Sequence, residues 1–273
     1  MHDRDMLTCL VRRLEGSGLL GEAERQALLA VHLHGRQVPA QTDIRVAHDP
    51  GGAFLILRGV ACRYEMLADG TRRIVALYFP GDLCASHPVI AIMSPGSIGA
   101  LSACTVADIP FRTIADLVRT HPNIERALWW LSIVELGIAQ QWLINFGRTA
   151  ERRVAHLICE IRARLHATGH DECGSFSNGI RQGALADITA VSAVHVNRVL
   201  NALKSARLID LSKGAVTVAA PDRLAAFAEF DPAYLHLPDR TVAAVPERGM
   251  MPAIGLLSQA PDREPADESR THA

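Results

Sequence analysis

The 273-residue sequence has no segment that resembles a targeting signal or a membrane anchor. Its first ten residues, MHDRDMLTCL, are charged and lack the long apolar run of a signal peptide. We find no stretch of the length needed to span a bilayer. The expectation is a protein of the cytoplasm with no membrane partner.

Cysteine is present but never grouped. No C-x-x-C pair or closer spacing marks a zinc site or an iron–sulfur cluster. We therefore expect free, buried thiols at Cys9, Cys62, Cys84, Cys104, Cys159 and Cys173.

Motifs of common enzyme classes are missing as well. There is no Walker loop, no G-x-S-x-G and no G-x-G-x-x-G, and Pro50-Gly51-Gly52 is interpreted as a turn. A net charge of −1 provides no general attraction to nucleic acid, so any DNA contact must come from a local surface. We expect no enzymatic activity, no catalytic residue, no metal and no cofactor.

The pattern that is present predicts two domains, for which the length and the apolar content of 49% are sufficient. Residues 1–34 have helical spacing. From residue 37, short apolar runs alternate with turn signals, above all Asp69-Gly70 between two such runs, a strong signal of a β-hairpin. A further strand in ALSACTVADIP completes a predicted antiparallel β-roll, and the helices around it make the chain α+β.

Residues 123–146 predict one long helix with two apolar stripes. Two apolar faces need two partners, so one face covers the β-roll and the other meets the same helix of a second subunit. The alternative is a fully buried helix in a monomer. The second stripe is Trp129, Ile133, Leu136 and Leu143, and the first, which we assign to the dimer interface, is Leu128, Leu131, Ile138 and Trp142.

Residues 181–205 have the arrangement of a helix-turn-helix. Leu185 and Ile188 point inward from the first helix, Ala186 allows a close approach, and Ala190 occupies the turn. Ser192 is a natural N-cap for the second helix, which we predict over 192–204. One face of that helix forms a buried stripe at helical spacing of Val196, Val199, Leu200 and Leu203.

The opposite face carries side chains that suit the major groove of DNA. Arginine can pair with guanine, asparagine with adenine, and valine can pack on a thymine methyl group. We assign phosphate contacts to Ser192 and His195. We assign base contacts to Ala193, Val194, Asn197 and Arg198. An ordinary helical hairpin with a solvated polar face is the alternative.

A wing follows the second helix. The run ARLIDLSKGAVTVAAPDRL predicts two short strands around a turn at Lys213-Gly214. The proline-rich, charged tail predicts disorder. We divide the chain into 1–120 (helical lead-in and sensor roll), 121–148 (dimerisation helix), 149–237 (DNA-binding domain) and 238–273 (tail).

Together these segments resemble the Crp/Fnr family of bacterial regulators, over about residues 20–237. The resemblance is carried by FLILRGVACRYEMLADGTRRIVALYFPGD, ALWWLSIVELGIAQQWLINFGRTAERRVAHLICEI, LADITAVSAVHVNRVLNALKSARLI and FDPAYLHL. It implies a homodimer with a cyclic-nucleotide-binding-like jelly roll and a winged helix-turn-helix. It also implies a two-fold-symmetric site on double-stranded DNA, and RNA polymerase as a partner.

The sequence departs from members that respond to cyclic AMP. Gly81-Asp82-Leu83 is present, but no Arg or Lys occurs from Ile74 to Phe111, and Ser94-Pro95 stands where the phosphate-binding arginine belongs. A cyclic phosphate needs such a cation or a row of backbone donors to offset its desolvation, so we expect an unknown effector other than cyclic AMP. Cys9 stands alone, which argues against an iron–sulfur sensor.

Three alternatives remain at this stage. Haem could bind one of the histidines His32, His34, His48, His87 and His121. The roll could serve only for dimerisation and sense nothing. The chain could also be a cupin-like small-molecule-binding or enzymatic β-roll, although His48, His87 and Glu65 do not form the ligand pattern that such metal sites need.

Overall fold

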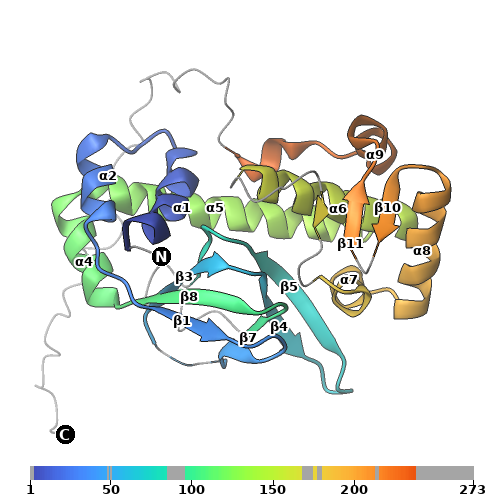
Figure 1. Ribbon diagram of the computed structural model, residues 1–273, viewed down its shortest axis with the longest axis horizontal. Helices are drawn as coiled ribbons and strands as arrows, with labels where there is room; N and C mark the ends of the chain where they lie inside the picture. The colour runs from blue at the N-terminus through green and yellow to red at the C-terminus, as the bar shows by residue number, and fades with distance from the viewer. Residues whose placement is uncertain are drawn as a thin grey trace, which may run out of the picture. The chain divides into compact units, whose positions relative to one another are not determined.

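The computed structural model describes residues 3–47, 49, 51–84, 96–167, 175–176, 180–212 and 215–237 (Figure 1). Residue contacts group the chain into one compact unit, 1–242, and a second unit, 243–273. The description below concerns the first unit. The finer division of that unit into sensor, long helix and DNA-binding domain stays a prediction.

Two helices precede the β-roll, α1 (Asp3–Glu15) and α2 (Glu22–Leu29). Apolar side chains of α1, among them Leu7 and Leu14, are buried in one cluster with Leu55 and Leu57 of the roll. The helical lead-in is therefore part of the core and not a free arm.

The roll consists of two four-stranded antiparallel sheets, in the orders β1-β8-β3-β6 and β2-β7-β4-β5. This confirms the predicted α+β class with an antiparallel roll. The strands are β1 (Gly35–Val38), β2 (Asp43–Arg45), β3 (Ala53–Arg58), β4 (Ala61–Met66), β5 (Arg72–Tyr78), β6 (Leu83–Cys84), β7 (Ser97–Ala100) and β8 (Cys104–Ile109).

The predicted hairpin joins β4 to β5. Gly70 has φ +79°, a left-handed conformation that glycine adopts without strain. The Thr71 N–H donates to the Asp69 carboxylate (2.8 Å), and the Leu67 N–H donates to the Thr71 carbonyl (2.9 Å). The Asp-Gly signal in the sequence is thus confirmed.

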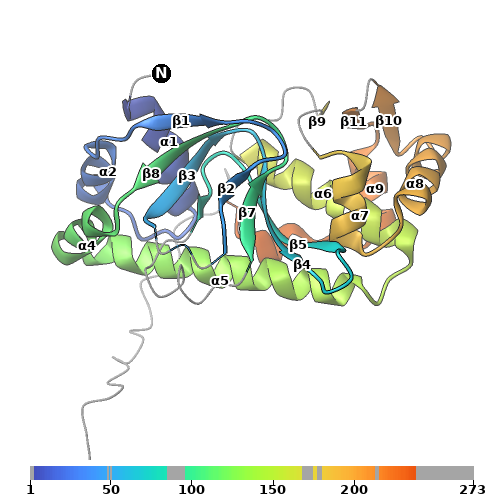
Figure 2. The same ribbon diagram turned by 90° about the horizontal axis from the view of Figure 1, so that it is seen from below.

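Helix α4 (Phe111–Thr120) leads into the long helix α5 (Pro122–Asn145), which runs alongside the roll (Figure 2). By length and composition alone, α5 is long and apolar enough to cross a membrane, with a mean hydropathy of 1.2. Our expectation that no stretch reaches this length was therefore wrong. The same test is passed by helices of other kinds, including the core helices of soluble proteins.

The two apolar stripes of α5 differ in burial. Ile138 and Trp142 are only 7% and 8% exposed and pack in the chain's own core. Leu128 and Leu131 are half-buried against the cluster that contains α1. Two of the four residues that we assigned to the dimer interface, Ile138 and Trp142, are thus already covered within the single chain. The exposed stripe is the other one, Trp129, Ile133, Leu136 and Leu143.

The C-terminal module begins with α6 (Ala150–Ala167) and contains α7 (Gln182–Thr189), α8 (Ala193–Ser205), α9 (Pro221–Ala228) and the 3-10 helix η1 (Pro232–Leu235). The predicted wing strands are β10 (Ile209–Ser212) and β11 (Ala215–Val218), paired antiparallel. A further strand, β9 (Ser175–Phe176), which the sequence analysis did not predict, pairs with β11.

Candidate nucleic-acid interface

The turn between α7 and α8 is held by backbone hydrogen bonds. Ala190 has φ +54° and lies in the left-handed region, and its N–H donates to the Ala186 carbonyl. The Val191 N–H reaches the same carbonyl at 3.3 Å. Because Ala186 is small and nearly buried, α8 can pack close to α7. This is the tight turn that the sequence predicts.

Ser192 caps the N-terminus of α8. Its backbone is extended, and its Oγ accepts a hydrogen bond from the His195 N–H (3.3 Å). The hydroxyl hydrogen of Ser192 stays available as a donor. The predicted N-cap is confirmed.

One face of α8 anchors it in the module. The predicted stripe of Val196, Val199, Leu200 and Leu203 is buried, with each side chain at most 2% exposed. These residues share a core with Leu185 and Ile188 of α7 and with Val154 and Ile158 of α6. The orientation of α8 is therefore set by burial of its apolar side.

The opposite face of α8 is exposed. Val194 is 74% exposed, although it is apolar. Ala193, Asn197 and Arg198 are exposed too, whereas His195 is half-buried. The structure thus brings the four predicted base-reading residues to one open surface at the N-terminal part of the helix.

Asn197 is held in place by two neighbours. Its Nδ2 donates to Gln182 Oε1 (3.2 Å), and its Oδ1 accepts from Asn201 Nδ2 (3.0 Å). An asparagine amide has two N–H groups and two lone pairs on its oxygen. One donor and one acceptor therefore stay free, which is the pair that bidentate contact with adenine requires.

Arg198 follows Asn197 in the sequence but, unlike Asn197, is not held by neighbouring side chains in the described part of the chain. It makes no hydrogen bond or ion pair with any other residue that the structure describes. A guanidinium without a partner on an exposed helix face is available to an acceptor-rich ligand, and guanine offers two acceptors in the major groove.

Gln182 is a member of this surface that the sequence analysis missed. It lies in the first turn of α7, fifteen positions before Asn197, so helical periodicity within α8 could not connect the two side chains. Only the packing angle between α7 and α8 places them together.

Arg153 of α6 fastens the helix-turn-helix to the end of α5. Its guanidinium donates to the carbonyl of Thr189, the last residue of α7 (2.7 Å), and to the carbonyls of Asn145 (3.2 Å) and Phe146 (3.0 Å). Helix C-termini leave carbonyl groups without partners. One side chain therefore caps two helix ends and couples the position of α7 to that of α5.

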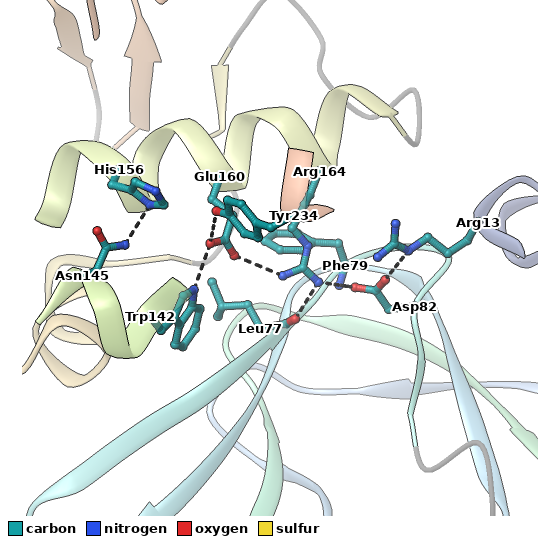
Figure 3. Close-up of polar contacts among 10 residues, drawn as sticks. All are labelled: Arg13, Leu77, Phe79, Asp82, Trp142, Asn145, His156, Glu160, Arg164 and Tyr234. Carbon is teal, nitrogen blue, oxygen red and sulfur yellow. Dashed lines mark hydrogen bonds and ion pairs between the residues drawn. The ribbon is translucent and has the colours of Figure 1, made fainter. Parts of the chain in front are cut away.

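A buried polar network joins the module to the roll (Figure 3). Glu160 of α6 accepts from Trp142 Nε1 and from the Tyr234 hydroxyl, both at 2.9 Å. Arg164, one turn further along α6, donates to Asp82 (2.8 Å) and to the Leu77 carbonyl (2.9 Å). The segment FDPAYLHL thus contributes Tyr234 to a contact with α6.

A second inter-module contact lies at the tip of the hairpin. Arg72 of β5 forms an ion pair with Asp187 of α7, with Nε and Oδ2 2.8 Å apart. Together with the buried network, this pair ties the roll to the first helix of the helix-turn-helix.

The described residues contain no group of three or more His, Cys, Asp or Glu side chains that could hold a metal ion. His48, His87, Cys173 and Ser94-Pro95, which the sequence analysis singled out, lie outside the described residues. The other five cysteines are free, and four of them are buried. The haem alternative is not tested by these observations.

Comparisons with known proteins agree with this geometry. Residues 152–227 match the family model described as a Crp-like helix-turn-helix domain. The chain is 28% identical over 223 residues to the transcriptional activatory protein AadR of Rhodopseudomonas palustris, a match that covers 81% of this chain and 91% of that one. It is 28% identical over 181 residues to the nitrogen fixation regulation protein FixK of Bradyrhizobium diazoefficiens, covering 64% and 73%.

The fold has relatives among solved structures. FixK2 from Bradyrhizobium japonicum superposes with a TM-score of 0.64 at 19% identity, covering 72% of this chain and 98% of that one. A second match is TTHB099, a CRP-family regulator from Thermus thermophilus, with a TM-score of 0.55 at 17% identity and a coverage of 71% and 96%. At these identities the matches support the fold alone.

An antiparallel roll, a long helix and a winged helix-turn-helix with an open outer face define a DNA-binding transcription regulator. The chain belongs to the Crp/Fnr family. Its roll is of the cyclic-nucleotide-binding-like type, and the chain is a regulator, not an enzyme. The enzymatic cupin alternative is thereby set aside.

Proposed function

We propose that the chain is a sequence-specific, cytoplasmic regulator that binds DNA as a homodimer. In this proposal, residues 192–204 of each subunit lie in the major groove of a two-fold-symmetric site whose half-sites are about one helical turn apart. The observation that carries the proposal is the outer face of α8, where Arg198 and Val194 are exposed on a helix whose other face is buried.

We assign the contacts as follows. Arg198 pairs with guanine, Asn197 with adenine through its free donor and acceptor, and Val194 and Ala193 pack on thymine methyl groups. The Ser192 hydroxyl and the half-buried His195 donate to phosphates, which position the helix without reading sequence.

The dimer contact in this proposal is the exposed stripe of α5. Trp129, Leu136 and Leu143 are spaced by seven residues, and Ile133 lies four after Trp129, which is the a/d spacing of a two-stranded coiled coil. Gln140 continues the series of Ile133 as a polar residue, of the kind that fixes register. The stripe is long enough to hold two helices in parallel around a two-fold axis.

RNA polymerase is the further protein partner that we propose, in line with the activator role named for the AadR relative. We propose that the roll responds to an effector other than cyclic AMP, because no Arg or Lys occurs between Ile74 and Phe111. Calorimetric titration with cyclic AMP should show no heat of binding, and tight binding would overturn this part.

The test of the proposed function is the Arg198→Ala variant in a gel-shift titration. Loss of a bidentate base contact should cost about 1–3 kcal/mol at the specific site, a weakening of roughly 5-fold to 150-fold. Binding to unrelated DNA should fall much less. Lys204→Ala, which removes one charge from the last turn of the same helix, is the matched control.

The control should keep the preference for the specific site. An Arg198→Ala protein that binds this site as tightly as the unmodified chain would contradict the assignment of α8 as the reading helix.

A further inference from the structure

Three side-chain amides contact one another on the outer surface of the helix-turn-helix. They belong to Gln182 at the start of α7 and to Asn197 and Asn201 of α8, two helices that pack side by side (Figure 1). All three residues are exposed. The proposed function assigns an adenine contact to Asn197, so the orientation of its amide determines what this side chain can recognise.

A backbone atom fixes the orientation of these amides. A carbonyl oxygen can only accept hydrogen bonds. The amide of Asn201 lies 3.0 Å from the backbone carbonyl oxygen of Asn197, so it must present its NH2 group there. The same Nδ2 atom of Asn201 is 3.0 Å from the side-chain amide of Asn197, which must therefore present its acceptor, Oδ1.

Gln182 supports the same orientation from the other helix. Because Oδ1 of Asn197 faces Asn201, its Nδ2 faces Gln182 and donates to Oε1 at 3.2 Å. Among the described residues, no other side chain donates to this Oε1. Exchanging the oxygen and nitrogen of the Asn197 amide would place NH2 against NH2 at Asn201 and oxygen against oxygen at Gln182.

The orientation matters because adenine presents its two groups in a fixed order. In the major groove, N7 of adenine accepts a hydrogen bond and the neighbouring N6 amino group donates one. An asparagine amide matches them with Nδ2 at N7 and Oδ1 at N6, and the reversed amide opposes donor to donor and acceptor to acceptor. Contact with DNA excludes water, so the mismatched groups would stay unpaired, which is costly.

We propose that Gln182 and Asn201 are positioning residues that hold the amide of Asn197 in one orientation and thereby determine its base preference. This inference rests on the proposed function, because it needs Asn197 in the major groove. Neither positioning residue has to touch a base. Without the acceptor of Gln182, the amide of Asn197 is free to rotate, and base pairs with a different order of donor and acceptor become acceptable.

The test is a gel-shift titration of the full chain with its selected site and with sites that differ by one base pair. Asn197→Ala identifies the pair that Asn197 reads, because substitution of that pair no longer weakens binding of this variant. At the same pair, Gln182→Ala should reduce discrimination about fivefold or more, since a bidentate contact contributes roughly 5-fold to 150-fold.

Two further variants separate positioning from loss of charge or fold. Gln182→Glu keeps an acceptor for Asn197, so the preference at this pair should remain, although the new charge weakens binding to all sequences. Arg181→Ala removes a charge from the exposed residue just before Gln182 and should weaken binding to all sequences alike, with the preference unchanged. Thermal unfolding should show that each variant is folded.

A double variant isolates the action of Gln182 through Asn197. When Asn197→Ala is already present, Gln182→Ala should change discrimination at this pair no further, because the side chain that it positions is gone. A direct base contact by Gln182, or a purely structural role in α7, would still show its effect in the double variant.

Three results would overturn the inference. They are full discrimination in Gln182→Ala, equal losses in Gln182→Ala and Gln182→Glu, or a further loss in the double variant. If Asn197→Ala identifies no base pair, the inference fails as well. In each case, a preference at another pair that Arg198→Ala removes would leave the reading of DNA by α8 standing, whereas a chain that prefers no sequence would contradict both.

Discussion

At the scale of single residues, burial decides the charge of His156. This side chain is 1% exposed and lies between the rings of Phe230 and Tyr234. Its Nδ1 is 2.8 Å from Asn145 Nδ2, which acts as the donor, because Asn145 Oδ1 accepts from Arg148. Burial, together with the charge of Arg148, lowers the pKa of His156 to about 4. The imidazole is therefore neutral in the folded protein.

A pH dependence of stability follows. The folded pKa lies below the unfolded value near 6.5, so the contribution of neutral His156 is complete above that pH and is lost as pH falls towards 4. The loss should reach roughly 2–3 kcal/mol. Urea unfolding between pH 7 and pH 4 measures it.

His156→Gln keeps an acceptor for Asn145 and is the comparison for this experiment. Burial raises the pKa of the neighbouring Glu160, which changes stability with the opposite sign, but this group is present in both proteins. The difference between the two profiles isolates His156. Parallel profiles would show that the imidazole is not held neutral.

At the scale of elements, the turn of the helix-turn-helix carries a strained alanine. Ala190 has φ +54°, a conformation that costs L-residues about 1 kcal/mol and glycine almost nothing. Ala190→Gly should therefore stabilise the protein by about 0.5 kcal/mol, after the greater freedom of glycine in the unfolded chain is subtracted. Chemical unfolding measures the change.

The matched control is Ala206→Gly at the end of α8. Ala206 has φ −76°, which alanine adopts without strain, so glycine there should lower stability by about 0.5–1 kcal/mol. Equal effects at the two positions would contradict the account of the turn.

The helix-turn-helix and the β4–β5 hairpin could be predicted from the sequence because their signals are local. The Ser192 cap, the apolar stripe of α8 and the Asp69-Gly70 turn each depend on residues within one or two turns of chain. Strand β9 was missed because it is two residues long and exists only through its pairing with β11. The contact between Gln182 and Asn197 was missed for a related reason, since it depends on how two helices pack.

At the scale of the whole molecule, the burial of each face of α5 depends on long-range packing, which the sequence pattern alone could not predict. Both stripes of α5 are apolar, so periodicity could predict two partners for the helix but could not assign a partner to each face. In the structure, the roll and the C-terminal module pack against the face of α5 that carries Ile138 and Trp142. The network of Arg13, Asp82 and Glu160 joins residues far apart in the sequence, and no spacing rule anticipates it.

The exposed stripe of α5 provides a test of the dimer. Leu136→Lys places a charge at the centre of the seam, at a residue that is 58% exposed in the single chain. Burying an unpaired ammonium is unfavourable, so the mass measured by analytical ultracentrifugation should fall from that of two chains to that of one. Affinity for a two-fold-symmetric site should fall as well.

Val46→Lys is the control, because Val46 is equally exposed but lies on the roll. This variant should remain dimeric. A Leu136→Lys protein with the mass of two chains would show that the α5 seam does not hold the dimer.

The central claim is that α8 reads DNA sequence, and selection of bound sequences from a random pool by the purified full chain tests it most directly. The account predicts enrichment of one sequence with two-fold symmetry and half-sites about 10 base pairs apart. It also predicts that the Arg198→Ala protein loses the preference at one position of each half-site. No enrichment, or the same enriched sequence with both proteins, would contradict it.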